Sequence, residues 1–579
     1  MAAQLQIAFG QHSSKGRKAV NQDFHAVMVP PEPQLGAKGV VVALADGISS
    51  SQVSQVASQT AVRSFLEDYY ATPDSWTVKS SAVKVLEATN SWLYAQTRNG
   101  PYRYDIDKGY VCTFTALVLK STRAHLFHAG DARVFRVVGG KLEQLTEDHR
   151  LWVSREKSYL SRALGMRERI EIDYHSFAIE AGDTFVLATD GVYEFVEPRF
   201  VAECIAAHQH QLDDAARMIV EEAYRQGSGD NMTVQIVRVE QVPEHAIGDL
   251  SEQAVTLPFP PELRPRMSFD GYGIVRELHH SHRNHVYLAL DQERGEQVVL
   301  KVPSVDLRAD AAYLERFLME EWVARRLDNV HILKSCAPPR KRGFLYLVTE
   351  YIEGQTLDQW MRDNPRPELE TVRAIVEQLA RGLQAMHRQQ MLHQDLRPSN
   401  IMIDRAGTVK IIDFGSVRVA GIAEASNPAE RQPILGTAQY TAPEYFLGEP
   451  GTARSDLFSL AVITYEMLSG RLPYGARVAR ATTRAAQHRL VYESVLDDER
   501  TIPAWVDGAL RKALNPNPFK RQEELSEFLH DLRRPNQALL RKGRPPLMES
   551  HPILVWKTIA LLLSLAVVAL ISTHPFFTQ

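Results

Sequence analysis

The chain has 579 residues, which is too long for one hydrophobic core, so its length predicts at least two domains. An apolar fraction of 44% and a charged fraction of 23% are typical of globular proteins and exclude a largely disordered or fibrous chain. Lys and Arg number 66 against 70 Asp and Glu, and the net charge of -4 leaves no overall positive field to attract nucleic acid.

Cysteine usage and the N-terminal sequence both favour the cytoplasm. Cys112, Cys204 and Cys336 are scattered and show no paired metal-ligand spacing, so we expect neither disulfides nor structural zinc. The first 18 residues, MAAQLQIAFGQHSSKGRK, lack a basic start followed by an apolar run and do not resemble a secretory signal. We therefore expect the bulk of the protein in a reducing compartment.

Residues 1–240 show the pattern of a mixed α/β domain. Short β-branched runs at 40–44, 114–119 and 185–188 alternate with helical stretches and with Gly-Asp turns. Acidic residues follow or end several of these runs. We predict one domain over this range.

The next part of the chain predicts a linker and then a two-lobed domain. Residues 241–267 contain five prolines and little hydrophobic periodicity, so we expect an extended linker there. Residues 268–535 pass from strand-rich sequence to long amphipathic segments such as 372–387 and 459–468. This order predicts a small β-rich lobe followed by a larger helical lobe.

The end of the chain predicts one transmembrane helix. Residues 553–572 are almost wholly apolar apart from Lys557, and as a helix they would span about 30 Å, the thickness of a bilayer core. A buried helix of a soluble domain is the alternative interpretation. Basic residues before and within the juxtamembrane segment 536–552, and their absence after Ser572, place both catalytic domains in the cytoplasm by the positive-inside rule. The expected localisation is therefore a single-pass membrane protein.

Four acidic turns in the N-terminal domain could form a metal site. They contain Asp23, Asp46, Asp190 and Asp230, and each follows or ends an apolar run. Carboxylates at strand ends project at a sheet edge, where several can converge, and hard cations such as Mg²⁺ or Mn²⁺ prefer such oxygen ligands. Turn formation alone is the alternative interpretation of any single Asp-Gly pair.

The sequence motifs around these turns resemble those of the metal-dependent protein phosphatase (PPM) family. In order they are GRKAVNQD, ALADGISS, CTFTALVL, HAGDARVF, LTEDH, SRALG, GDTFVLATDGVYEFV and GSGDNMTV. The resemblance implies an α+β sandwich of two β-sheets flanked by helices, which removes phosphate from Ser and Thr of phosphoproteins. It also implies two or three Mg²⁺ or Mn²⁺ ions. It assigns the site to Asp46, the Gly47 carbonyl, Asp190 and Asp230 as ligands, Asp23 behind them, and Asp131 at a third, weaker metal.

Two positions depart from the family pattern. The arginine that commonly grips the substrate phosphate is replaced by Lys18, with Arg17 beside it, and either cation could bind phosphate. Ser49 and Ser50 stand where a glycine pair is common, which narrows the site without removing a ligand. An inert phosphatase fold is the alternative interpretation of this half.

The second half resembles the protein kinases. The words that carry the likeness are VVLK, ending at Lys301, then Glu320, HQDLRPSN over 393–400, DFG at 413–415 and APE at 442–444. The resemblance implies a bilobal α+β kinase fold that uses ATP with Mg²⁺. Its expected catalytic residues are Lys301, Glu320, Asp395 and Arg397. Its expected nucleotide and metal contacts are Leu278, Val286, Lys301, Glu350, Ile352, Asn400 and Asp413, the last two as Mg²⁺ ligands.

The nucleotide loop LHHSHRNHVY at 278–287 departs from the kinase pattern. His279, Ser281 and Asn284 stand where the family has glycines, so backbone wrapping of phosphate should cost more and ATP should bind weakly. Its four histidines could indicate a metal site. We favour a solvated hairpin, because no carboxylate or cysteine of the loop completes a ligand set. In the catalytic loop, Gln394 replaces the arginine that meets an activation-loop phosphate.

The sequence thus predicts a bifunctional Ser/Thr protein kinase and metal-dependent phosphoprotein phosphatase. The alternative is an active phosphatase with a kinase-like module that senses nucleotide or docks substrates. Expected partners are protein and phosphoprotein substrates, ATP and a membrane, but not nucleic acid. The oligomeric state is left open.

Overall fold

The computed structural model describes most of the chain. The residues outside the description are 1–3, 155–156, 244–256, 282–283, 308–309, 337–341, 425–437, 476, 497–501, 537–538, 540–551 and 574–579. The described residues form two compact units. The first comprises Met1–Trp360 with Arg381–Thr437, and the second comprises Met361–Ala380 with Ala438–Gln579.

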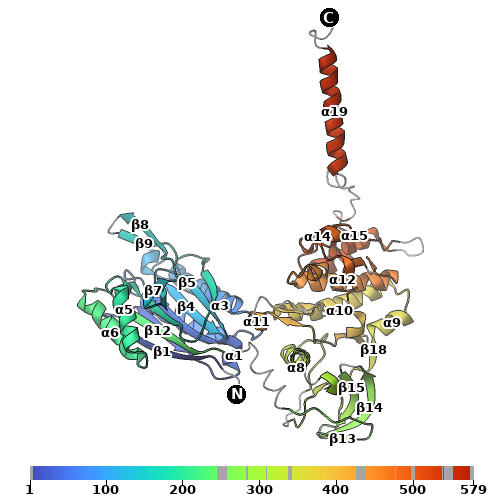
Figure 1. The fold of residues 1–579 in the computed structure, drawn as a ribbon, viewed down its shortest axis with the longest axis horizontal. Coiled ribbons are helices and arrows are strands. Elements are labelled where there is room, and N and C mark those ends of the chain that lie inside the picture. Colours follow the sequence, from blue (N-terminus) through green and yellow to red (C-terminus); the bar gives the residue numbers. More distant parts are fainter. Residues whose placement is uncertain are drawn as a thin grey trace. The chain divides into compact units, whose positions relative to one another are not determined.

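Two antiparallel five-stranded sheets build the N-terminal part of the first unit (Figure 1). One has the order β1 (Gln6–Ser14), β12 (Met232–Gln241), β11 (Thr184–Ala188), β6 (Arg133–Val138), β7 (Lys141–Gln144). The other has the order β10 (Asp173–Ala178), β5 (Arg123–Ala129), β4 (Phe114–Lys120), β3 (Val40–Asp46), β2 (Asp23–Met28). A separate hairpin pairs β8 (Arg150–Ser154) with β9 (Lys157–Leu160).

The side chains of β3 point alternately to its two faces, which explains why the two sheets stack and why helices cover them. Val40, Val42 and Leu44 belong to a buried cluster that also contains residues of β11 and β12, so they pack between the sheets. The intervening residues, such as Val41 and Ala43, belong to the cluster that contains the helices on the outer face. Successive side chains of a strand point to opposite faces, so a strand buried on both faces is a continuous apolar run.

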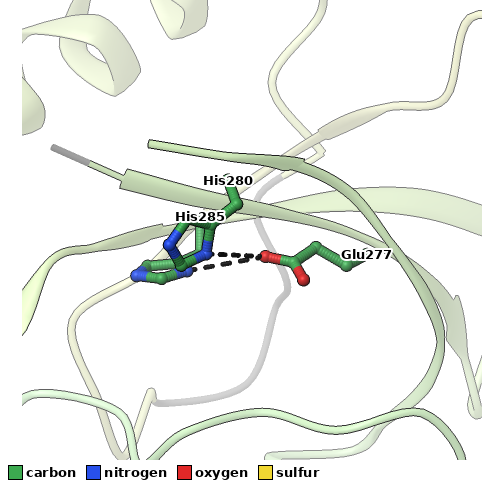
Figure 2. A group of neighbouring side chains, drawn as sticks. All are labelled: Glu277, His280 and His285. Atoms are coloured by element: carbon green, nitrogen blue, oxygen red, sulfur yellow. Dashed lines mark hydrogen bonds and ion pairs between the residues drawn. The ribbon is translucent and has the colours of Figure 1, made fainter. Parts of the chain in front are cut away.

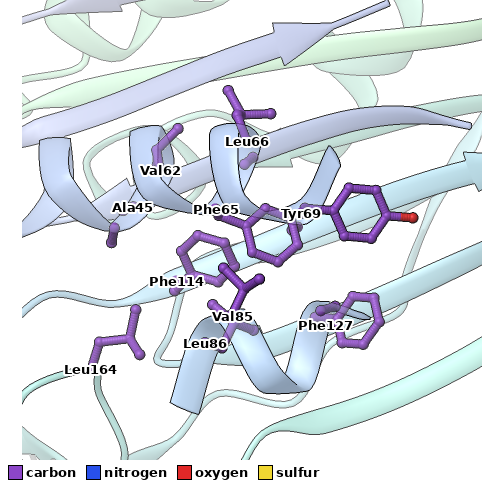
Figure 3. Packing of buried hydrophobic residues seen from close by; sticks show 14 of the residues in the cluster. Ala45, Val62, Phe65, Leu66, Tyr69, Val85, Leu86, Phe114, Phe127 and Leu164 are labelled. Atoms are coloured by element: carbon purple, nitrogen blue, oxygen red, sulfur yellow. The ribbon is translucent and has the colours of Figure 1, made fainter. Parts of the chain in front are cut away.

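The covering helices follow from the same pattern. The second sheet packs against α2 (Ser54–Ala71) and α3 (Val78–Asn99), and Figure 3 shows the aromatic and aliphatic side chains between them. The rings of Phe65 and Phe114 lie 5.0 Å apart there. The first sheet packs against α5 (Pro198–Ala207) and α6 (Leu212–Arg225). Two short helices, α1 (Gln34–Lys38) and α4 (Asp190–Tyr193), and the 3-10 turn at Ile106–Lys108 complete this part. The result is the sandwich that the sequence resemblance implied.

A third antiparallel five-stranded sheet follows in the same unit. Its strands are β13 (Ser268–Phe269), β14 (Tyr272–His280), β15 (Asn284–Asp291), β16 (Gln297–Pro303) and β17 (Leu347–Glu350), in that order. Helix α8 (Ala311–Arg326) lies in sequence between β16 and β17. Leu263, from the predicted linker, is buried in the core of this sheet, and Leu345 N donates to Pro258 O at 2.9 Å. The end of that linker therefore packs against the small lobe.

Short strands flank the segment that contains the kinase-like motifs. β18 (Gly354–Thr356), β20 (Ile401–Asp404) and β21 (Val409–Ile411) form one small sheet, and β19 (Met391–Leu392) pairs with β22 (Arg418–Val419). A 3-10 turn covers Pro398–Asn400, and α11 (Ala420–Ala423) follows β22. Helices α9 (Leu357–Asp363) and α10 (Leu369–Arg388) precede these strands in the sequence.

The second unit is helical. Besides part of α10 it contains α12 (Ala453–Ser469), α13 (Arg477–Arg480), α14 (Arg484–His488), α15 (Ala504–Ala513), α16 (Leu525–Arg533), α19 (Pro552–Thr573) and the 3-10 turns Pro443–Leu447 and Pro518–Lys520. A capping box between Thr452 and Ser455 starts α12. Helix α12 is buried over most of its length.

A buried ion pair joins distant segments of the second unit. The Arg521 guanidinium donates to both carboxylate oxygens of Glu444 at 2.8 and 2.7 Å, and the two side chains are 0% and 3% exposed. Arg521 also donates to the carbonyls of Arg454, Asn515 and Pro516. Since both charges are desolvated, removing one leaves the other uncompensated.

We predict that Arg521→Ala destabilises the full chain by about 3–5 kcal/mol, because Glu444 would remain buried without its partner. Chemical denaturation should show this loss. The matched control is Arg484→Ala, which removes an exposed pair with Glu449 and should cost less than about 1 kcal/mol. Equal effects of the two substitutions would contradict the role of burial.

The C-terminal helix departs from the membrane prediction. A helix does cover the predicted range, since α19 runs over Pro552–Thr573. Within the part of the chain that the structure describes, however, no helix reaches the length and apolarity required to span a bilayer. The predicted transmembrane helix over 553–572 is therefore not supported.

Candidate active sites

The predicted carboxylates of the N-terminal domain converge at one end of the two sheets. Asp23 and Asp46 lie directly opposite each other in the register of β2 and β3. Asp190 begins α4 just after β11, and Asp230 precedes β12. Strands β11 and β12 are neighbours in the first sheet, whereas β2 and β3 belong to the second. The Asp23 Oδ2 atom accepts hydrogen bonds from Thr189 Oγ1 at 3.1 Å and Thr233 Oγ1 at 2.7 Å, which links the two sheets.

This cluster carries more negative charge than its hydrogen bonds satisfy. Burial raises the pKa of Asp46 well above its usual range, and the nearby carboxylates of Asp23, Asp190 and Asp131 add to that rise. Burial, with repulsion from Asp131 and Asp230, raises the pKa of Asp190 to about 7. Among the described residues, Asp23 Oδ1 and Asp190 Oδ1 are buried and accept no hydrogen bond. Oxygen atoms in this state fit divalent cations.

Two glycines allow the acidic turns to approach their neighbours. A Cβ atom on Gly191 would lie 2.0 Å from the Asn231 carbonyl oxygen, and one on Gly47 would lie 2.8 Å from the Ser54 carbonyl oxygen. Asn231 is itself buried and accepts from the amide of Gln22 at 2.9 Å. The glycines after Asp46 and Asp190 are therefore required for packing as well as for turn formation.

The structure distinguishes the two candidate phosphate-binding cations. Lys18 Nζ contacts a carboxylate oxygen of Asp230 and donates to Ser49 Oγ at 2.6 Å, so it lies beside the acidic cluster. Arg17 instead donates to the Gly227 carbonyl at 3.2 Å and stacks over the ring of Tyr224. The cluster and Lys18 are brought together, whereas Arg17 points elsewhere.

Arg150 is a member of this site that the sequence analysis missed. Its guanidinium donates to Asp131 Oδ2 at 2.6 Å, to Asp190 Oδ2 at 2.7 Å and to Glu194 Oε1 at 2.7 Å. It thus bridges two of the predicted metal ligands. The only sequence signal was a basic residue directly after the word LTEDH, which specifies no contact by itself.

A buried histidine positions the turn that carries Asp131. His149 Nδ1 accepts from the Gly130 amide at 3.1 Å, and its Nε2 lies 2.9 Å from Asp173 Oδ2. Tyr193 donates its hydroxyl to the Asp131 carbonyl at 2.8 Å. The turn is therefore held from both sides, by the second sheet through Asp173 and by α4 through Tyr193.

The predicted lysine and glutamate of the kinase-like part form an ion pair. Lys301 Nζ donates to both carboxylate oxygens of Glu320 at 2.7 Å, joining β16 to α8. Burial alone would lower the pKa of Lys301, but the carboxylates of Glu320 and Asp413 outweigh burial and raise it. Lys301 therefore remains an ammonium group in this site.

The catalytic segment brings together the other predicted polar residues. Asn400 Nδ2 donates to the Asp395 carbonyl at 2.9 Å and lies 3.3 Å from Asp395 Oδ2, while Arg397 Nε lies 3.6 Å from the same oxygen. The Ile412 amide donates to the Asn400 carbonyl at 3.0 Å, which fixes the loop beside Asp413. Burial would raise the pKa of Asp413, but Lys301 and the Gly415 amide lower it.

The residues predicted to contact nucleotide differ from one another in burial and in their partners. Val286 is opposite Lys301 in the register of β15 and β16, so both side chains lie on one face of the sheet. Leu278 is half-buried in β14, and Ile352 is buried. The Glu350 carboxylate is bound by Lys410 Nζ at 2.7 Å. Its amide donates to the Lys334 carbonyl at 3.1 Å, so this amide is engaged within the protein.

Two family models match adjoining parts of the chain. Residues 11–223 match the model described as "Protein phosphatase 2C", and residues 276–537 match the one described as "Protein kinase domain". The chain is similar to the serine/threonine-protein kinase PrkC of Bacillus subtilis, with 28% identity over 263 residues, covering 45% of this chain and 40% of the relative. It is also similar to the serine/threonine-protein kinase PknB of Mycobacterium leprae, with 31% identity over 297 residues, covering 50% and 45%.

A solved structure resembles the first half. The serine/threonine phosphatase PstP/Ppp of Mycobacterium tuberculosis is 24% identical, covers 40% of this chain and 99% of its own, and has a TM-score of 0.35. The chain spans less than half the length of the two curated relatives. The similarities to these two relatives therefore concern parts of them rather than their whole length.

We predict that Arg150→Ala changes metal binding at the acidic cluster. A guanidinium and a divalent cation compete for Asp131 and Asp190 oxygens, so the variant should bind Mn²⁺ roughly tenfold more tightly while its metal-free form melts at a lower temperature. Calorimetric titration and thermal melting of the full chain measure both effects. Arg136→Ala, which breaks a pair of comparable exposure with Asp183 outside the cluster, is the control. Unchanged Mn²⁺ affinity in the Arg150 variant would show that no competition occurs.

Proposed function

We propose that this chain, which carries a protein phosphatase 2C domain followed by a protein kinase domain, both attaches phosphate to Ser and Thr side chains of proteins and removes it. The observation that carries the proposal is that both sets of charged residues are complete. The acidic cluster around Asp46 and Asp190 is buried and short of positive charge, and Lys301 is paired with Glu320. A chain of this kind would set the phosphorylation level of its substrates by the balance of two activities.

In the phosphatase domain, we assign the binding of two divalent cations, Mg²⁺ or Mn²⁺, to Asp46, the Gly47 carbonyl, Asp190 and Asp230. Cations held there would supply a hydroxide nucleophile and neutralise charge on the phosphoryl oxygens. Asp23 fixes the site from behind through its hydrogen bonds to Thr189 and Thr233. This division of roles needs no nucleophile from the protein.

The remaining charged groups of the phosphatase site would orient substrate. Lys18 lies next to Asp230, where its ammonium group can contact a substrate phosphate. Asp131 is the candidate ligand of a third cation, but Arg150 already supplies positive charge to it. Because Asp131 is the one protein ligand assigned to it, we expect a third cation to bind less tightly than the first two.

In the kinase domain, the proposed roles follow from charge and position. Lys301, held by Glu320, would bind the α and β phosphates of ATP, and Asn400 with Asp413 would hold Mg²⁺. Asp395 would orient the substrate hydroxyl and accept its proton, with Arg397 near the transferred phosphoryl group. The depressed pKa of Asp413 favours the ionised form that metal binding requires.

A nucleotide-sensing or docking module is the second candidate for this domain. The observation that favours it is the hairpin of β14 and β15, where His279, Ser281 and Asn284 replace glycines. Phosphate wrapping by backbone amides is costlier without glycine. The two candidates differ in one measurable property, because only an active kinase transfers phosphate.

The test is autophosphorylation of the full chain. Asp190→Ala disables the phosphatase, so label from γ-labelled ATP should accumulate on this variant to at least about threefold the wild-type level, since erasure no longer competes. Adding Asp395→Ala should remove the label. Candidate acceptors are Ser416 and Thr441, together with Ser426 and Thr437, which lie outside the described residues. Asp214→Ala, at a half-buried residue of α6 that pairs with Arg217, is the control.

Two outcomes would reject parts of this proposal. An Asp190→Ala chain without label, at several metal and ATP concentrations, favours the nucleotide-sensing module. Full hydrolysis of a phosphopeptide by the wild-type chain in excess chelator would rule out the metal-dependent mechanism.

The place of the protein in the cell stays a prediction. The sequence favours a single-pass membrane protein with both catalytic domains in the cytoplasm, whereas no helix among the described residues qualifies as a span. Carbonate extraction of membranes from cells that express the chain distinguishes the two possibilities, because a spanning helix resists it. Complete release into the soluble fraction would reject the membrane assignment.

A further inference from the structure

An irregular hairpin gathers three potential metal ligands in the kinase domain. In the pairing of β14 with β15, Glu277 is opposite Tyr287, while His279 is opposite Val286 and His280 is opposite His285. The register shift between Glu277 and His279 adds one residue to β14. Residues three apart in a regular strand point to opposite faces, so this bulge allows Glu277 and His280 to share a face.

The three side chains converge, as Figure 2 shows. His280 Nδ1 lies 3.1 Å and His285 Nδ1 lies 3.6 Å from the same carboxylate oxygen, Glu277 Oε1. One ligand atom from each residue lies within 4.8 Å of the others. Metal–ligand bonds of about 2.0–2.1 Å in a tetrahedral site place ligand atoms roughly 3.3 Å apart, close to the observed separations.

We infer that Glu277, His280 and His285 form a binding site for a divalent transition-metal ion of the Zn²⁺ class. Two imidazole nitrogens and one carboxylate oxygen suit Zn²⁺, whereas Mg²⁺ prefers oxygen ligands alone. Three protein ligands leave a fourth position for water. The carboxylate that the sequence analysis did not find in the histidine loop comes from Glu277, one residue before it.

The site lies on the face of the sheet away from the proposed nucleotide contacts. Val286 shares a face with Lys301, and its neighbour His285 is opposite Val302. Because adjacent residues alternate, the metal ligand His285 lies on the other face from Lys301. A bound ion would tie β14 to β15 without occupying the position of ATP. It would thereby stiffen the hairpin whose loop lacks glycines.

The test is Co²⁺ and Zn²⁺ titration of the untagged full chain in excess Mg²⁺. Tetrahedral Co²⁺ with nitrogen ligands absorbs visible light far more strongly than octahedral Co²⁺ with oxygen ligands, so the phosphatase site contributes little. We expect a visible band that Zn²⁺ abolishes. His280→Ala and His285→Ala should each weaken Zn²⁺ binding by about tenfold or more, since each removes one of three ligands. His279→Ala, at a neighbouring exposed histidine outside the set, is the matched control.

Equal Zn²⁺ affinity in the wild type and in the His280 and His285 variants would overturn the assignment. An equal loss in the His279 variant would also overturn it, because binding would then depend on histidine number rather than on this geometry. Melting temperatures equal to that of the metal-free wild type show that each variant is folded. None of these readouts depends on kinase or phosphatase activity.

A second, independent observation concerns contacts inside the first compact unit. The segment between α2 and α3 of the phosphatase domain meets two backbone stretches of the kinase domain. Gly421 N donates to Ser75 O at 2.9 Å, and Trp76 Nε1 donates to Arg388 O at 2.9 Å. The Thr77 amide donates to Gln390 Oε1 at 3.2 Å. The bond between Gly421 and Ser75 joins two backbones directly, which requires close approach of the two segments.

A buried charge pair anchors the same contact. Lys120, at the end of β4, is 4% exposed, and its Nζ donates to Glu424 Oε1 at 2.9 Å and to the Gly421 carbonyl at 2.7 Å. The Val78 amide, at the start of α3, donates to both Glu424 oxygens at 2.9 and 3.0 Å. The carboxylate is thus held by an ammonium group and by a helix N-terminus together.

The geometry points to an intramolecular docking surface for the kinase segment Ala420–Glu424, formed by Lys120 and residues 74–78. This segment follows β22, which pairs with β19 just before the catalytic loop. Gly421 is necessary for the fit, because an added Cβ would lie 2.6 Å from the Trp76 carbonyl oxygen and 2.9 Å from that of Ser75. The phosphatase domain would thereby fix the start of the kinase activation segment.

Hydrogen exchange of the full chain tests this docking. Gly421→Ala should speed exchange of the Val78 and Gly421 amides by about tenfold or more, because the contact cannot form without displacement of backbone. Lys120→Met, which removes the ammonium group, should act in the same direction. Gly273→Ala, whose added Cβ makes only ordinary contacts at 3.6 Å and beyond, is the matched control.

Unchanged exchange at Val78 in both the Gly421 and the Lys120 variants would overturn the docking surface. Rapid exchange of both amides in the wild-type chain would do so as well. Because the readout is amide protection, the result is independent of whether either catalytic activity is present.

Discussion

Repulsion among buried carboxylates is the constraint on which the phosphatase half depends. Asp23 and Asp46 face each other across paired strands of the second sheet, and Asp190 joins them from the end of β11 in the first sheet. Their pKa values are raised because desolvation and mutual repulsion disfavour the charged forms. Such a cluster is tolerated where positive charge is supplied, here in part by Arg150 and Lys18 and, in the proposed function, by divalent cations. Stability and metal binding are therefore linked in this domain.

In the kinase half, buried charges are compensated by other charged side chains of the protein. Lys301 is partly buried, with 19% of its side chain exposed, and the carboxylates of Glu320 and Asp413 raise its pKa, so it stays ionised. Burying a charge is costly unless it is paired, and this pairing also fixes α8 relative to β16. In the proposed function, both halves would prepare sites for phosphoryl groups by fixing charge in advance, one with an excess of carboxylates and the other with a compensated lysine.

The sequence predicted those features that depend on local hydrophobic pattern or on motifs shared with a known family. The buried runs of β3, β4 and β11 and the placing of Asp23, Asp46 and Asp190 near one another follow from them. Contacts that depend on backbone irregularity or on partners distant in the sequence could not be predicted from such patterns. Glu277 joins two histidines only because of a bulge, and Arg150 meets carboxylates 19 and 40 residues away. The apolar C-terminal range gave a helix, but the predicted membrane span was not supported.

The central claim is that one chain carries a kinase whose product its own phosphatase can erase. The most direct measurement uses the Asp190→Ala chain, labelled with γ-labelled ATP and freed of nucleotide, as the substrate for unlabelled chains. Wild-type chain with Mn²⁺ should release the label as inorganic phosphate, whereas wild type in chelator and added Asp190→Ala chain with Mn²⁺ should not. Label that persists with wild type and Mn²⁺, or a substrate chain that never acquires label, would contradict the account.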